Sequence, residues 1–342
     1  MGVSRFELEV SSPFRLGLTV WALRRRAHNA IDTWDGTWYR RTVVLGGRPV
    51  GLAVRQEPDD GRARSVLVVE VRAAGSAPDD AELTEARHLL EQTLGLGVDL
   101  SGFYSLVERD RRLVPLAHRF VGMRPPRLPS VFEALVNAVA CQQLSLTVGI
   151  HLLNRLARCY GPTLPGRMNA PAGFPTPESL AGPDPTHLRI LGFSHAKART
   201  LTLLARRVAS GDVDLVGLED LDDKAAVAAL AELPGIGRWS AEYTLLRGLG
   251  RWHVLPGDDV GARNNLRRRF GLAADAGYDD VADLSRSWSP YGGIVYFHLL
   301  LDGLDRAGKL GDGWELADDG EPERAREPSA APMGRHRCGE VA

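Results

Sequence analysis

Two adjacent carboxylates, Asp258 and Asp259, stand in a Leu-Pro-Gly-Asp-Asp segment just before an expected helix. By itself, Pro-Gly-Asp-Asp is typical of a turn whose Asp caps the next helix. Asp259 can cap a helix that begins near Val260 and still face a cleft, and the positive helix end favours its ionised form. A fixed carboxylate stabilises the oxocarbenium-like sugar formed during N-glycosidic cleavage, and it can orient or deprotonate the attacking water. The structural and the chemical interpretation are compatible.

A second segment that could bind a ligand runs from Leu233 to Gly237, between two helical stretches. Gly235 and Gly237 flank Ile236, so the backbone can turn tightly and approach a ligand closely. The next helix directs free N–H groups and its positive dipole end beyond the turn, which suits a phosphate oxygen. We expect Ile236 to pack between the two helices. The structural alternative is an ordinary helix–helix turn with a glycine C-cap.

The residues that follow this turn favour a phosphate ligand. Trp239 and Tyr243 are four positions apart and therefore share one face of a helix. Residues 233–270 carry seven arginines against three acids, a local charge of +4 in a chain whose formal net charge is −1. Such an excess indicates a site for a polyanion, although a solvated helix face is the alternative for Arg267 to Arg269 alone. The seven are Arg238, Arg247, Arg251, Arg263, Arg267, Arg268 and Arg269.

The overall composition is that of an ordinary globular protein, with 342 residues, 44% hydrophobic and 25% charged. The net charge gives no global signal for nucleic acid, so that interpretation depends on local features. No segment has the apolar length of a signal peptide core or a membrane span. The cysteines Cys141, Cys159 and Cys338 fit neither a disulfide framework nor a metal motif. We therefore expect a protein of the reducing cytoplasm.

The N-terminal part of the chain, residues 1–105, is expected to form an α/β domain. Residues 38–45 and 48–56 have strand character, and Gly46-Gly47 between them is typical of a two-residue hairpin turn. The order of strands and helices predicts a small antiparallel sheet with helices on one face. With the helical remainder, the fold class is α+β.

Residues 106–315 are expected to form a mostly helical core of two subdomains, with the active-site cleft between them. Ser130 and Glu133 have the spacing of a capping box, so a helix should start at Val131. Residues 316–342 have no periodicity and are expected to be a disordered tail.

The hairpin, the aromatic pair and the aspartate, in this order and spacing, resemble the helix-hairpin-helix DNA glycosylases. Within that superfamily the chain most resembles the bacterial 3-methyladenine DNA glycosylase II family, over most of residues 1–300. The strongest parts are LPGIGRWSAEYTLLRGLG at 233–250 and LPGDDVGAR at 255–263. FEALVNAVACQQLS at 132–145 resembles the first large helix of the family, and SWSPYGGIVY at 287–296 resembles its closing helix.

The resemblance implies roles for individual residues. Asp259 matches the catalytic aspartate, and Asp258 is its neighbour. Trp239, Tyr243 and Tyr291 match aromatic walls of the pocket that receives the damaged base, where a positively charged alkylpurine would be attracted to aromatic faces. Glu242 is expected to face away from Trp239, which leaves the pocket without a second acid.

The hairpin and the wedge follow from the same resemblance. Gly235 and Gly237 would supply amides to a phosphate, and the carbonyls of Leu233 and Ile236 would hold a structural Na⁺ or K⁺, with no catalytic metal. The position that inserts into the duplex falls on Gln143 or on Leu144 beside it.

Two departures from related branches restrict the chemistry. Bifunctional relatives that also nick the strand carry a lysine just after the hairpin as Schiff-base nucleophile, whereas this chain has Trp239 there. The endonuclease III branch carries four clustered C-terminal cysteines for an iron–sulfur cluster, whereas this chain has only Cys338 in that region. Neither lyase activity nor a cluster is expected.

The resemblance therefore implies a monomeric, monofunctional glycosylase of base excision repair. It would flip an alkylated purine out of double-stranded DNA, hydrolyse its N-glycosidic bond and leave an abasic site. A glycosylase for an oxidised or deaminated base is one alternative. A non-catalytic helix-hairpin-helix DNA-binding protein is another, although such a module needs neither the carboxylate nor the aromatic pocket.

Overall fold

The computed structural model describes residues 2–58, 63–164 and 170–311. Five strands form one antiparallel sheet in the order β1-β5-β4-β3-β2. Gly46 and Gly47 have φ angles of +55° and +79° and form the tight turn between β3 and β4. The antiparallel sheet and its hairpin are thus confirmed, whereas the two-residue strand β2 was not anticipated. The strands are β1 (Gly2–Ser11), β2 (Thr33–Trp34), β3 (Trp38–Leu45), β4 (Arg48–Gln56) and β5 (Arg64–Ala73).

The sheet packs through alternating side chains, since successive residues of a strand face opposite sides. Leu67, Val69 and Val71 of β5 are fully buried in the core beneath the sheet. Helix α2 (Asp80–Thr93) covers this sheet, and it begins with a capping box between Asp79 and Glu82.

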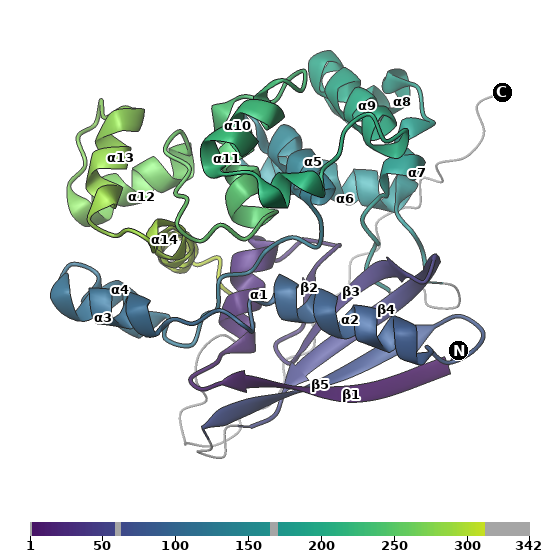
Figure 1. Ribbon diagram of the computed structural model, residues 1–342, viewed down its shortest axis with the longest axis horizontal. Helices are drawn as coiled ribbons and strands as arrows, with labels where there is room; N and C mark the ends of the chain where they lie inside the picture. The colour runs from purple at the N-terminus through teal and green to yellow at the C-terminus, as the bar shows by residue number, and fades with distance from the viewer. Residues whose placement is uncertain (1, 59–62, 165–169, 312–342) are drawn as a thin grey trace.

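Helix α1 (Leu16–Arg24) joins the sheet to the helical layer (Figure 1). Leu16 and Val20 pack into the sheet core, while Leu18 and Trp21 pack into a second core with α14. Trp21 is therefore a core residue. The domain boundary predicted at residue 105 falls within helix α3, whose Phe103 belongs to the same second core as Trp21.

The rest of the described chain is helical, which confirms the α+β class. Helix α10, the hairpin and α11 follow one another directly, and α12 starts after a short loop. The predicted tail, residues 316–342, lies outside the described residues. No helix in the described part is long and apolar enough to cross a membrane. The helices are α3 (Ser101–Arg109), α4 (Val114–Arg119), α5 (Val131–Cys141), α6 (Leu146–Tyr160), α7 (Pro177–Ala181), α8 (Pro185–Ile190), α9 (His195–Ala209), the 3₁₀ turn η1 (Gly217–Asp220), α10 (Asp223–Ala231), α11 (Arg238–Arg247), α12 (Val260–Phe270), α13 (Tyr278–Arg286) and α14 (Gly292–Arg306).

Helix α5 starts at Val131 as predicted, but only half of the capping box forms. The Ser130 hydroxyl accepts the amide of Glu133, while the carboxylate of Glu133 turns away to a buried ion pair with Arg41 at 2.5 Å. Arg41 also pairs with Asp32 at 2.7 Å. Removing a charge from water is costly unless the charge is paired, so the Glu133 carboxylate pairs with Arg41 and does not complete the capping box. The ion pairs connect the sheet to α5.

Candidate active site

Asp259 caps helix α12, as the sequence predicted. Its Oδ1 accepts the amide of Ala262 at 2.7 Å. Its Oδ2 accepts the indole Nε1–H of Trp239 at 3.2 Å and the hydroxyl of Tyr296 at 3.3 Å. Three donors from three helices therefore orient one half-buried carboxylate, and the positive end of α12 favours its negative charge.

The neighbouring Asp258 has a different environment. It forms ion pairs with Arg238 at 2.8 Å and with Arg263 at 2.7 Å. Arg238 also stacks over the ring of Tyr278, with its Cζ 3.7 Å from the ring centroid. Asp258 thus ties the start of α11 to α12, while Asp259 keeps only neutral hydrogen-bond donors.

Glu242 supports the loop that carries both aspartates. Its side chain is buried and accepts the amide of Gly257 at 3.2 Å and the hydroxyl of Tyr278 at 2.5 Å. Burial raises the pKa of Glu242 and, together with this hydrogen bond, raises the pKa of Tyr278 to about 12. Glu242 is directed to the loop backbone, in line with the expectation that it faces away from Trp239.

Trp239 and Tyr243 lie on one face of α11, with ring centroids 5.5 Å apart and planes inclined by 37°. Trp239 is partly exposed, whereas Tyr243 is buried and its hydroxyl accepts a hydrogen bond from Arg25 at 2.8 Å. The two rings lie next to each other near Asp259, with Trp239 closer to the surface and Tyr243 deeper in the protein.

The two tyrosines of the last segment occupy different surroundings. Tyr291 caps α14 and packs edge-on against Phe103 of α3, with ring centroids 6.2 Å apart. Its hydroxyl lies so close to Gly102 that a Cβ there would be 1.9 Å away. Tyr296, more than one turn further along α14, contacts Asp259 instead. Sequence reasoning did not single out Tyr296, because the apolar stretch around it carries no mark of a site.

The hairpin has the geometry that its glycines suggest. Gly235 has a φ of +81°, and a Cβ at this position would lie 2.4 Å from the hydroxyl of Thr200. Leu233 and Ile236 are buried in the core, so Ile236 packs between the helices as expected. Among the described residues, no backbone carbonyl accepts the amides of Gly235 or Gly237. Both amides are therefore available to a ligand.

The segment after α5 is fixed to this hairpin. Gln142 donates from Nε2 to the carbonyl of Gly235 and to the Ser240 hydroxyl, both at 2.9 Å. Gln143 has a left-handed φ of +53° and is exposed, and Leu144 is 42% exposed. The exposed side chains of Gln143 and Leu144 thus belong to a loop that is hydrogen-bonded to the hairpin at Leu233 to Gly237.

The arginine count overstated the free positive charge. Arg247 is fully buried, and Arg251 pairs with Asp223 at 2.7 Å. Arg238 and Arg263 share the single carboxylate of Asp258, which offsets one of their two charges. Counting along the chain could not reveal these pairings, because tertiary structure creates them. Within the described ranges, Arg267 and Arg268 form no ion pair and remain available to a polyanion.

Comparison with known proteins shows which families the chain resembles. Residues 136–290 match the model of the HhH-GPD superfamily of base excision DNA repair proteins. The chain is 28% identical to DNA-3-methyladenine glycosylase 2 of Escherichia coli, over 78% of this chain and 93% of the relative. It is 28% identical to the DNA-3-methyladenine glycosylase of Bacillus subtilis, over 61% and 69% respectively. The chain spans only 55% and 57% of the length of two other curated relatives.

A solved structure agrees with the sequence relatives. The 3-methyladenine DNA glycosylase of Archaeoglobus fulgidus superposes with a TM-score of 0.75 at 26% identity, covering 89% of this chain and 98% of that structure. The match therefore extends well beyond residues 136–290. Over residues 136–290 the chain resembles the HhH-GPD superfamily of base excision DNA repair proteins, and over most of its length it resembles the bacterial DNA-3-methyladenine glycosylase II family.

Proposed function

We propose that this protein is a monofunctional DNA glycosylase that hydrolyses the N-glycosidic bond of alkylated purines in DNA, of the 3-methyladenine and 7-methylguanine type. The observation that carries the proposal is the carboxylate of Asp259, which Trp239 and Tyr296 orient next to the paired rings of Trp239 and Tyr243. A DNA-binding module without activity has no need for such an arrangement.

In the proposed mechanism the damaged nucleotide leaves the duplex, because its glycosidic bond is inaccessible within the stack. The extruded base stacks on Trp239, with Tyr243 behind it and Tyr291 at the far wall. Asp259 stabilises the oxocarbenium character that develops at C1′ and orients the attacking water. An N3- or N7-alkylated purine is already positively charged, so its bond breaks without a second acid.

DNA is held by the hairpin in this proposal. The free amides of Gly235 and Gly237 bind a phosphate at the positive end of α11. The Leu233 carbonyl accepts one backbone hydrogen bond, from Ile236, and keeps a second lone pair. It and the Ile236 carbonyl fit as oxygen ligands of a structural Na⁺ or K⁺. Gln143 or Leu144 fills the gap left in the duplex.

The absence of lyase chemistry is part of the proposal. The residue after the hairpin that would form a Schiff base is Trp239, which cannot. Lys197 is engaged elsewhere, because its Nζ donates to the carbonyls of Ala140 and Gln142 at 3.0 and 2.7 Å.

Release of free bases from methylated duplex DNA tests the proposal. We expect 3-methyladenine and 7-methylguanine in the soluble fraction after chromatography, and abasic sites in the DNA. Binding of the duplex without any base release would identify a non-catalytic DNA-binding protein. Release confined to oxidised or deaminated bases would assign a different glycosylase specificity.

A further inference from the structure

Lys197 holds the end of helix α5 from a neighbouring helix. It lies in the first turn of α9, and its half-buried side chain donates from Nζ to the carbonyls of Ala140 and Gln142 at 3.0 and 2.7 Å. At the C-terminal end of a helix the carbonyls lack internal partners, and the helix dipole favours a positive charge. One ammonium group therefore fixes the backbone where α5 passes into the loop that carries Gln143.

The same face of α9 also supports the hairpin. Thr200 comes three positions after Lys197 and therefore lies on the same side of the helix. The hydroxyl of Thr200 would lie 2.4 Å from a Cβ at Gly235, so α9 and the turn of the hairpin are in close contact. Helix α9 thus contacts both the loop after α5 and the hairpin that is proposed to bind a phosphate.

The loop between α5 and α6 is held at further points. The side chain of Gln142 donates to the Gly235 carbonyl and to the Ser240 hydroxyl, both at 2.9 Å. Beyond the loop, Nε of Arg26 donates to Oγ1 of Thr147 at 3.1 Å, in the first turn of α6. The loop is therefore attached to the hairpin and fixed at both of its ends.

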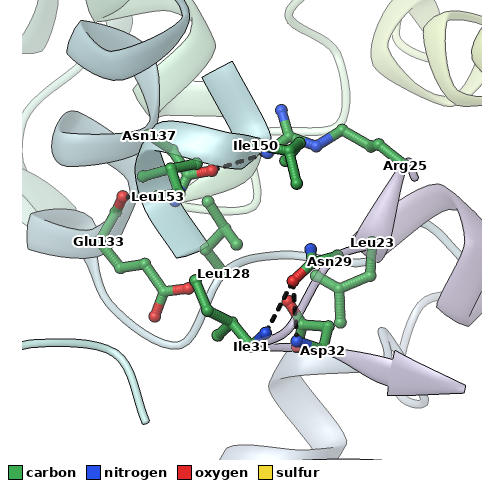
Figure 2. A pocket seen from close by; sticks show the side chains of 10 residues that line it. All are labelled: Leu23, Arg25, Asn29, Ile31, Asp32, Leu128, Glu133, Asn137, Ile150 and Leu153. Atoms are coloured by element: carbon green, nitrogen blue, oxygen red, sulfur yellow. Dashed lines mark hydrogen bonds between the residues drawn. The ribbon is translucent and has the colours of Figure 1, made fainter. Parts of the chain in front are cut away.

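Helix α5 gives the loop a fixed base. Nη2 of the buried Arg25 donates to Oδ1 of Asn137 at 2.7 Å, as Figure 2 shows. One turn earlier, Glu133 forms the buried ion pair with Arg41. Because these contacts attach α5 to the N-terminal domain, the direction that the chain takes after α5 depends on the contacts at its C-terminal end.

The backbone of Gln143 shows that these contacts impose a conformation on the loop. Its φ of +53° lies in the left-handed region. This region is costly for a residue other than glycine, and such a conformation persists only where the surroundings enforce it. The side chains of Gln143 and Leu144 are exposed. The loop thus presents two exposed side chains in a conformation that its attachments maintain.

We infer that Lys197 is a positioning residue for the opening of the duplex. Its ammonium group keeps the loop of Gln143 and Leu144 at a fixed place relative to the hairpin. Binding of a phosphate at the hairpin then brings the loop to the gap that the extruded nucleotide leaves. Lys197 has no part in breaking the glycosidic bond. The inference rests on the proposed glycosylase function and adds a residue whose loss should impair extrusion from a duplex more than bond cleavage.

The test is the ratio of two single-turnover rates of 7-methylguanine release, one from a duplex and one from the same strand without its complement. A single strand has no paired stack to open, so only the duplex rate should depend on the loop. We expect Lys197→Met to lower the ratio of the duplex rate to the single-strand rate about tenfold, since a small displacement of a positioned group is costly. A ratio cancels any general loss of folded enzyme.

A second variant and a matched control accompany this measurement. Gln142→Leu removes the hydrogen bonds to the hairpin segment and should lower the ratio in the same direction. It leaves Lys197 in place, so it tests the loop even if Lys197→Met does not fold. Arg206→Met is the control. Arg206 lies nine positions further along α9 and donates from Nε to the carbonyl of Ala181, the last residue of α7, at 2.9 Å. Loss of this comparable contact, away from the loop, should leave the ratio unchanged.

Equal ratios in the wild type, Lys197→Met and Gln142→Leu would overturn the inference. An equally large fall of the ratio in Arg206→Met would overturn it as well, because the effect would then be a general loosening of α9. A wild type that releases 7-methylguanine from neither substrate would instead count against the proposed function itself.

Discussion

The indole of Trp239 donates its Nε1–H to Oδ2 of Asp259 over 3.2 Å. Trp239 stands at the position where bifunctional relatives carry the Schiff-base lysine. In this chain the side chain at position 239 orients the carboxylate of Asp259 and is aromatic. A lyase needs an amine at this position.

Asp259→Asn should reduce base release at least about a hundredfold, because the charge opposite the oxocarbenium is removed. Asparagine is as good a helix cap as aspartate, so the melting temperature and the binding of abasic DNA should change little. Asp258→Asn is the control. It loses partly exposed ion pairs with Arg238 and Arg263, worth about 1 kcal/mol or less, and should keep most of the activity. The opposite pattern would mean that Asp258 is the catalytic residue.

Borohydride trapping tests the environment of position 239. The wild type should give no covalent adduct with a damaged duplex and should leave the strand intact until alkali or heat is applied. Trp239→Lys places an amine near the carboxylate, so a trapped adduct that maps to this position should appear in that variant. An adduct of the wild type that maps to Lys197, Lys224 or Lys309 would contradict the monofunctional assignment.

Affinity for DNA should fall linearly on a logarithmic salt scale, with a slope of about 0.9 per phosphate contact. Since most of the arginines in residues 233–270 are buried or paired, the slope should correspond to a few contacts rather than seven. Titration of a labelled duplex at several salt concentrations measures it. An affinity independent of salt would remove the DNA-binding proposal.

The two hairpin glycines should respond differently to alanine. Gly235→Ala meets a φ of +81° and the hydroxyl of Thr200, so it should lower the free energy of unfolding by about 1–3 kcal/mol. Gly237→Ala meets no atom within 4 Å and has an ordinary φ, so its melting temperature should match the wild type. Its methyl group nevertheless enters the space proposed for the phosphate, and affinity for DNA should drop. Unchanged affinity of Gly237→Ala would place the phosphate elsewhere.

The features that sequence analysis predicted are those with local signals. The cap at Asp259, the turn at Gly235 and the Gly46-Gly47 hairpin each depend on residues within four positions of one another. The sheet followed from strand patterns joined by a turn of standard length. Such features need no knowledge of the tertiary structure.

The features that escaped prediction depend on distant contacts. Tyr296 reaches Asp259 across 37 positions, and Arg25 reaches Tyr243 across 218. The pairing of Glu133 with Arg41 spans 92 positions and overrides the local capping signal. In each case the partner is selected by packing of elements whose relative placement no local pattern specifies.

His298 should make stability depend on pH below neutrality. Its ring is fully buried and contacts the ring of Phe103, with centroids 4.9 Å apart and planes inclined by 37°. Its Nδ1–H donates to the carbonyl of Ile294, while Nε2 has no partner in the described structure. Burial lowers its pKa from 6.5 to about 4. Between these values the unfolded chain takes up a proton that the folded chain does not, so the free energy of unfolding should fall as the pH drops from about 6.5 to 4. For one histidine the loss amounts to about 3 kcal/mol.

The variant His298→Phe separates this contribution from the carboxylates, which also titrate on acidification. Phenylalanine retains the ring and its contact with Phe103, so the fold should persist, with a loss at neutral pH from the hydrogen bond to Ile294. Denaturant titrations at pH 7, 6, 5 and 4.5 should show the wild-type stability falling more steeply than that of the variant, because only the wild type has the buried His298 to protonate on unfolding. The gap between the two curves should therefore narrow or reverse toward low pH. Parallel curves over this range would mean that His298 takes up its proton at the same pH in the folded and in the unfolded chain, with Nε2 bound to a partner such as water.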